Sequence, residues 1–260
     1  MRGFIGFSGT FCALCAAVAL AIGCAAPAQQ AKKSLASTPP VDVHVYGKLR
    51  DIMHRGLTAR RVDLNPLIGQ RGGYALGALE GLKGEMTLWD GALWLSTPDG
   101  AGGATAANQR TTGAGATLLV HAKRSRWRAE SISQSVSFSG LDAFIAQRAA
   151  AAGVDVREAF PFRIEGVVKR VDWHVIDGSK IPPGVHGHAA HIKTAVKGTL
   201  TGTPVKILGF YSPKHHAIFT HHDTNTHAHV ICESAKIMGH VDHLDLMPGA
   251  TLHLPESQAP

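Results

Sequence analysis

Three histidines in the C-terminal part of the chain have the spacing of a metal site. His227 and His229 form an H-x-H pair, and His240 follows after ten intervening residues. Val230 and Ile231 favour a β-strand, in which residues i and i+2 face the same side, so both imidazoles of the pair would project together. Three neutral imidazoles that leave coordination positions open suit a catalytic Zn²⁺ ion, or another divalent transition metal.

The segment between the pair and His240 predicts how the third histidine reaches the first two. It reads CESAKIMG, with the polar residues and glycine of a turn, and residues 240–244 could return as a paired strand. Such a hairpin would place His240 beside the pair. The alternative is coincidence, because the chain has 16 histidines and His221, His222 and His243 would then be solvated neighbours.

Length and composition indicate a globular protein. The chain has 260 residues, of which 45% are hydrophobic and 17% charged, which is enough for one large or two modest domains with proper cores. The net charge of +7 is spread over many short segments. Its densest run, residues 123–128, is interpreted as a solvated strand edge, so nucleic-acid binding is not expected.

Residues 1–24 predict a lipoprotein signal peptide. A positively charged start precedes an apolar run, and Ala21-Ile22-Gly23-Cys24 resembles a lipobox in which Ala replaces the usual first Leu. The chain is therefore expected to be exported, to the periplasm or the cell surface, and held at a membrane by lipid on Cys24. The alternative is an ordinary secretory signal cleaved near Ala25 or Ala26. The apolar run is shorter than the ~20 residues of a spanning helix.

The remaining chain predicts an α+β fold with mainly antiparallel or mixed β-sheets and few helices. Residues 25–40 have the composition of a tether. Two β-rich halves are expected to follow: an N-terminal subdomain with one helix over residues 41–155 and a C-terminal metal-binding subdomain over residues 156–260.

Three local signals refine this expectation. The Asp90-Gly91 pair predicts a tight hairpin turn. Ser139, with Asp142 three residues later, predicts the N-cap of the clearest helix, which the N-terminal sheet would carry. Residues 181–191, with two prolines and three histidines, read as an irregular crossing.

Several stretches then follow the order found in the alpha-acetolactate decarboxylase family. They are the segment LGALEGLKGEM that contains Glu85, the strand sequence RIEG at residues 163–166, KGTL at residues 197–200, GFYSP at residues 209–213, and the H-x-H-x10-H interval, which matches the family's zinc triad. The chain therefore resembles this family from about Tyr46 to Leu254. The resemblance implies decarboxylation of 2-acetolactate to acetoin, with zinc and nearby glutamate and arginine side chains.

The resemblance also implies roles for individual residues, with two departures. Glu85 would handle the proton. The position of the family's catalytic arginine holds His174, and a neutral imidazole cannot replace a guanidinium that binds a carboxylate through two parallel bonds. Arg170, on the same strand face as His174, would compensate in part. The family also returns a tail glutamate to the metal, whereas Glu256 is expected in a solvated tail.

The leading hypothesis is a metal-dependent lyase that acts on 2-acetolactate or a related 2-hydroxy-3-oxo acid. One alternative is an exported metal-binding lipoprotein that keeps the fold and the triad without decarboxylase activity; the pairs His215-His216 and His221-His222 could extend its metal-capture surface. Another is a lyase whose substrate has its acid group absent or differently placed. A homodimer is one assembly that the chain could adopt.

Overall fold

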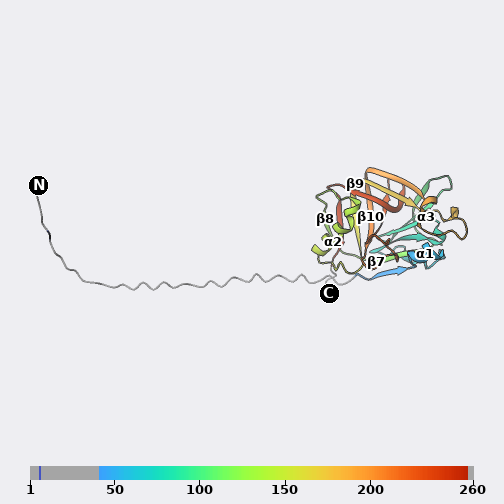
Figure 1. Ribbon diagram of the computed structural model, residues 1–260, viewed down its shortest axis with the longest axis horizontal. Helices are drawn as coiled ribbons and strands as arrows, with labels where there is room; N and C mark the ends of the chain where they lie inside the picture. The colour runs from blue at the N-terminus through green and yellow to red at the C-terminus, as the bar shows by residue number, and fades with distance from the viewer. Residues whose placement is uncertain (1–5, 7–40, 257–260) are drawn as a thin grey trace. The chain divides into compact units, whose positions relative to one another are not determined.

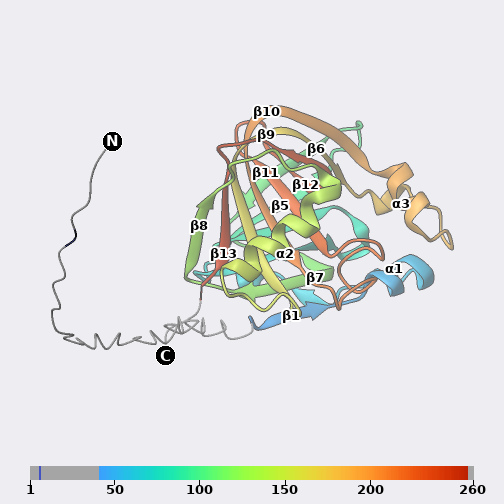
Figure 2. The same cartoon turned by 60° about the vertical axis from the view of Figure 1, so that its left-hand side comes forward.

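The computed structural model describes Gly6 and residues 41–256, and this part of the chain folds into two antiparallel β-sheets with three short α-helices (Figure 1, Figure 2). The predicted α+β class, with mainly antiparallel sheets and few helices, is confirmed. The predicted signal peptide (1–24, with the lipid site Cys24) and tether (25–40) lie outside the described residues. Among the described residues, none of the helices has the length and hydrophobicity needed to cross a bilayer.

The first sheet has the strand order β1-β7-β3-β4-β5-β6, and β2 pairs with β7. The predicted hairpin turn is confirmed at Asp90-Gly91, which joins β4 to β5. Both residues have positive φ, 50° and 81°, as the tight turns of two-residue hairpins require. The strands are β1 (Val43–Tyr46), β2 (Val62–Asp63), β3 (Gly73–Leu79), β4 (Glu85–Trp89), β5 (Ala92–Pro98), β6 (Ala104–Gln109) and β7 (Gly115–Lys123).

The second sheet has the order β10-β11-β12-β9-β13-β8, and β9 also pairs with β10 along its length. The chain passes from one sheet to the other between Lys123 and Trp127, so β8 joins the second sheet. The division into subdomains over residues 41–155 and 156–260 stays a prediction. The strands are β8 (Trp127–Ser131), β9 (Phe160–Val175), β10 (Val196–Tyr211), β11 (Thr226–Cys232), β12 (Ile237–Leu246) and β13 (Thr251–Pro255).

The helices correct two local predictions. A 3-10 turn leads directly into α2, so Gly140 takes the N-cap position without a side-chain hydrogen bond, and the prediction of a Ser139 cap was wrong. Helix α2 packs against β10 of the second sheet and not on the first. Helix α3 begins within the segment expected to be irregular. The α-helices are α1 (Leu49–Arg55), α2 (Leu141–Ala151) and α3 (His188–Thr194); the 3-10 helices are η1 (Asn65–Leu67), η2 (Glu80–Leu82), η3 (Phe138–Gly140) and η4 (Gly178–Lys180).

The largest hydrophobic core joins the two sheets. Leu76 and Val120 of the first sheet are buried in one cluster with Phe162 and Val171 of the second. Burial of each such side chain contributes roughly 1.5–3 kcal/mol, so the interface between the sheets is a main source of stability. Polar side chains that point into this dry interface must find partners there, and this is where the candidate site lies.

Candidate metal centre

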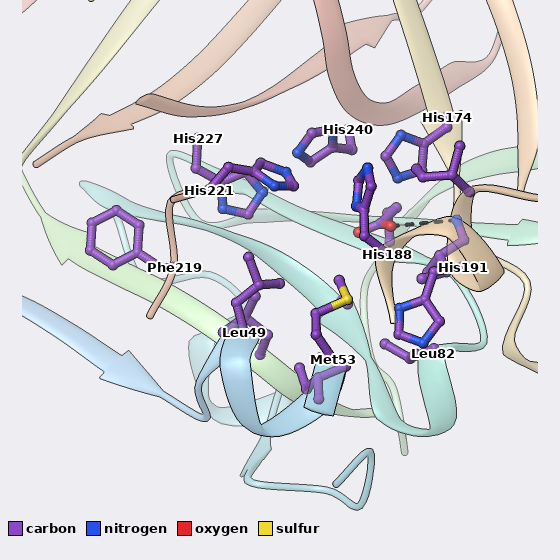
Figure 3. A pocket seen from close by; sticks show the side chains of 16 residues that line it. Leu49, Met53, Leu82, His174, His188, His191, Phe219, His221, His227 and His240 are labelled. Carbon is purple, nitrogen blue, oxygen red and sulfur yellow. Dashed lines mark hydrogen bonds between the residues drawn. The ribbon is translucent and has the colours of Figure 1, made fainter. Parts of the chain in front are cut away.

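A cavity between the two sheets gathers most of the residues predicted to form a site. Glu85 comes from the first sheet, and His174, His227 and His240 come from the second. Figure 3 shows histidines along one side of this cavity and apolar side chains of α1 on the other. The remaining lining residues are Leu49, Ile52, Met53, Ala78, Leu82, Leu118, Ile176, His188, His191, Ile192, Phe219 and His221.

Strand register places three histidines in a row across the second sheet. His229 of β11 pairs with His240 of β12, and His240 pairs in turn with His174 of β9. Cross-strand partners present their side chains on the same face, so the three rings line up toward the first sheet. The hairpin predicted between His229 and His240 is confirmed.

His227 adds a ring to this row from two residues before His229 on β11. The ring centroids are 5.2 Å apart for His227 and His229, 5.0 Å for His227 and His240, and 5.8 Å for His229 and His240. The period of two in a strand and the turn of the hairpin therefore bring together the three histidines that the spacing singled out.

Each of the three histidines has a buried ring nitrogen with no hydrogen-bond partner among the described residues. These atoms are Nδ1 of His227, Nε2 of His229 and Nδ1 of His240. An unpaired buried polar atom costs about 1–3 kcal/mol, so three in one cluster need an explanation. The opposite nitrogen of His229, Nδ1, lies 3.0 Å from Oγ1 of Thr87. In a metal-binding imidazole, one ring nitrogen makes a hydrogen bond and the other is free to bind the metal. Three imidazole nitrogens are suitable ligands for a divalent ion.

Burial keeps these imidazoles neutral. It lowers the pKa of His227 and His229 well below the usual histidine range, and the neighbouring His240 lowers both further. The pKa of His240 is also lowered by burial, although its contact with Asp242 opposes the shift. Only a neutral imidazole can coordinate a metal, so the surroundings prepare all three rings for this role.

Glu85 lies beside the free nitrogen of His229. Its Oε2 is 3.8 Å from that Nε2, and its Oε1 accepts a hydrogen bond from the backbone N–H of Ile176 at 3.4 Å. Burial raises the pKa of Glu85 well above its usual range, against the lowering effect of the Ile176 N–H. Burial therefore favours the protonated form of this carboxyl group in the metal-free protein. Gly84 is needed before it, because a Cβ at that positive φ would overlap the carbonyl oxygen of Ser96.

His174 reaches the cavity and is held by a residue that the sequence analysis missed. Its Nδ1 lies 2.7 Å from Oδ1 of Asp242, which stands at a β-bulge between Val241 and His243 of β12. Burial alone would raise the pKa of Asp242, but the hydrogen bond from His174 and the nearby His240 ring, 3.4 Å away, outweigh it and lower the pKa. One ligand atom from each of His174, His240 and Asp242 lies within 4.8 Å of the others. The i, i+2 spacing of His240 and Asp242 was the signal available in the sequence.

Arg170 and Glu256 are not brought to the cavity. The guanidinium of Arg170 binds both carboxylate oxygens of Asp172, at 3.0 and 2.8 Å, on the exposed side of β9. Four residues along a strand span about 13 Å, so sharing a face with His174 does not bring Arg170 to the same place. Glu256 pairs with Arg126 at 3.6 Å. Within the described part of the chain, the cavity lining includes neither lysine nor arginine.

Three further histidines border the cavity without having been predicted there. His188 and His191 come from α3, and His221 comes from the loop before β11. The rings of His188 and His221 are 5.4 Å apart, and those of His221 and His240 are 5.7 Å apart. His221 is therefore not the solvated neighbour that the alternative reading of the spacing would make it. Burial, followed by the charges of His240 and His188, lowers its pKa to about 4.

Comparison with known proteins gives one family and several solved structures. The family described as Alpha-acetolactate decarboxylase matches residues 44–257. Alpha-acetolactate decarboxylase from Bacillus subtilis strain 168 is 16% identical with a TM-score of 0.65, covering 82% of this chain and 85% of that one. Acetolactate decarboxylase from Bacillus subtilis subspecies spizizenii is 17% identical with a TM-score of 0.66, covering 82% and 86%. At these identities the structures show a shared fold. No curated protein sequence gives a significant match.

Proposed function

Because this chain belongs to the alpha-acetolactate decarboxylase family, we propose that it is a metal-dependent decarboxylase of 2-acetolactate or a related 2-hydroxy-3-oxo acid. The observation that carries the proposal is the cluster of three buried histidines, each with a ring nitrogen that has no partner among the described residues. The buried carboxyl group of Glu85 lies 3.8 Å from one of these nitrogens, Nε2 of His229. His227, His229 and His240 would hold Zn²⁺ or a similar divalent ion. A bound ion supplies a Lewis acid that stabilises the negative charge developing on the substrate's oxygens.

Glu85 has the properties of the proton donor in this reaction. Loss of carbon dioxide breaks a carbon–carbon bond and leaves its electron pair on the remaining fragment as an enediolate. A proton must then reach carbon to give the hydroxyketone product. Burial favours the protonated form of the Glu85 carboxyl group, which lies 3.8 Å from His229, so we assign it the delivery of this proton.

His174 would position the substrate's carboxylate. Its Nδ1 is hydrogen-bonded to Asp242, and the other ring nitrogen, Nε2, is available to a substrate in the cavity. The ring of His174 can therefore contact the anionic end of a substrate in the cavity. A single imidazole contact binds a carboxylate less firmly than a guanidinium with two parallel hydrogen bonds, so weaker substrate binding is expected than with an arginine at this position. Arg170 has no part in this proposal, because Asp172 holds its guanidinium.

The decisive experiment is turnover. Purified protein loaded with zinc is mixed with 2-acetolactate, and acetoin and carbon dioxide are measured against the metal-free protein. Equal release of both products above the metal-free rate supports the proposal. Stoichiometric zinc binding without product would favour the alternative of a metal-binding protein that has lost decarboxylase chemistry, which the lack of lysine and arginine in the described cavity lining also favours. Related hydroxyketones whose acid group is absent or differently placed would then test whether the enzyme acts on another substrate.

We further propose that the chain is exported and anchored to a membrane through lipid on Cys24, with residues 25–40 as a tether. Changing Cys24 to Ser should move the protein from membrane to soluble fractions, and unchanged retention would rule out the lipid. A homodimer remains a separate proposal, which analytical ultracentrifugation of the soluble variant would test.

A further inference from the structure

We infer that Asp242 is an additional, anionic ligand of the same metal and that His174 holds it in place. The inference rests on the proposed metal site at His227, His229 and His240. It concerns residues of β9 and β12 that the spacing of the triad does not include, and it is carried by distances, by the strand geometry at Asp242 and by the charge of the cavity.

The distances suit two ligands of one ion. Oδ1 of Asp242 lies 3.4 Å from Nδ1 of His240, and this is the ring nitrogen of His240 that lacks a hydrogen-bond partner among the described residues. Ligand atoms about 2.0–2.2 Å from a tetrahedral ion are separated by roughly 3.3–3.6 Å. The two atoms therefore already have the separation of neighbouring ligands.

The strand geometry explains how Asp242 reaches this position. Pairing of β12 with β9 is regular at His240 and Val241, and it shifts at His243, so Asp242 is an extra residue on β12. A β-bulge of this kind bends the strand and redirects a side chain, and bulges are frequent beside active sites. Here the redirected side chain is the carboxylate, and the cross-strand partner of His240, His174, meets it.

The hydrogen bond from His174 fixes the carboxylate. Nδ1 of His174 donates to Oδ1 of Asp242 at 2.7 Å, and the centroids of the His174 and His240 rings are 4.6 Å apart, with the rings tilted by 37°. A ligating carboxylate usually has such a partner, which orients it and reduces the entropy lost on metal binding. Removing the partner typically weakens metal affinity 10- to 100-fold.

The charges in the cavity also call for a carboxylate. Three neutral imidazoles would leave the double positive charge of the ion uncompensated. Glu256, at the end of the described residues, does not supply the compensating negative charge to the cavity, because it pairs with Arg126. Asp242 would supply a negative charge from within β12.

The test is metal binding by the full chain. D242N and D242A should each weaken zinc affinity at least about tenfold in competition with a chelating dye, and should change the visible absorption spectrum of the Co²⁺-loaded protein. H174A should weaken zinc affinity by a similar factor. D245N is the matched control: Asp245 lies on the same strand and pairs with His243, so its affinity and spectrum should equal those of the unchanged protein.

Wild-type zinc affinity and an unchanged Co²⁺ spectrum in both Asp242 variants, with the fold intact by circular dichroism, would overturn the inference. H227A separates this failure from failure of the proposed function. If H227A loses zinc while D242A retains it, only the role of Asp242 is removed and the triad stands. If H227A retains zinc, the proposed site itself is wrong, and the inference falls with it.

Discussion

The hydroxyl of Thr87 lies 3.0 Å from Nδ1 of His229, and this contact links the first sheet to the second at the candidate site. Thr87 is on β4 and fully buried, two residues after Glu85. The period of two in a strand therefore places a supporting hydroxyl and a carboxyl group on one face of β4, opposite the histidines of β11. The contact orients His229 so that Nε2 is free.

Thr87→Val should weaken zinc binding about 10- to 100-fold, because the ring of His229 loses the group that orients it. The metal-free protein should lose about 1 kcal/mol of stability, the net worth of one hydrogen bond. Zinc affinity is measured by dye competition and stability by urea unfolding. Thr199→Val is a suitable control, since Thr199 binds Asp172 on an exposed face. Equal zinc affinity in the two variants would refute the supporting role of Thr87.

His227→Ala and His229→Ala should each abolish stoichiometric zinc binding, because each removes one of three converging imidazoles. His222→Ala should bind zinc normally, since that residue is exposed in the preceding loop. His221 is not a suitable control, because its ring borders the cavity. The zinc content of each variant is measured by elemental analysis after dialysis. Full zinc occupancy in both triad variants would show that other histidines carry the metal.

Glu85→Gln should lower kcat about 10²- to 10⁴-fold while zinc binding and folding are kept. Glutamine resembles the protonated carboxyl in shape and can still accept the N–H of Ile176, but it cannot give up a proton. Glu80→Gln, at a surface carboxylate paired with Arg60, should leave kcat unchanged. Acetoin formation is measured with both variants loaded with zinc. Wild-type kcat in Glu85→Gln would exclude Glu85 as the proton donor.

The parts of the site that the sequence predicts are those set by local periodicity. The H-x-H pair lies on a strand, and a turn returns the chain at His240, so neighbouring residues alone determine both features. Asp90-Gly91 is predictable for the same reason, since positive φ at both positions favours this pair.

The parts that the sequence does not predict depend on pairing between distant strands. The period of two places Asp242 on the same face as His240, but its contact with His174 depends on the pairing of β12 with β9 and on the bulge at this point, which the sequence does not show. Arg170 lies on the same strand face as His174, yet its ion pair with Asp172 and its distance along the strand keep it from the cavity. His188 enters the site from α3, in a segment whose prolines suggested irregular structure. Tertiary packing decides each of these placements.

Acid should destabilise the metal-free protein, and His221 provides a way to measure part of this effect. Its pKa is lowered from the model-peptide value near 6.5 to about 4 in the folded state, chiefly by burial. Between these values the unfolded chain binds more protons than the folded one, so stability falls as the pH is lowered from 6.5 toward 4. Titration of this residue contributes at most about 3 kcal/mol to the free energy of unfolding.

The variant His221→Gln should therefore lose less stability than the unchanged protein between pH 7 and pH 4.5, because glutamine does not titrate. His227 and His229 remain in both proteins, so the difference between them reports on His221 alone. Urea unfolding at the two pH values, in the presence of a metal chelator, gives the free energies. His222→Gln should keep the full pH dependence, since its side chain is exposed. If His221→Gln and His222→Gln lose the same free energy on acidification, His221 is not held neutral in the cavity.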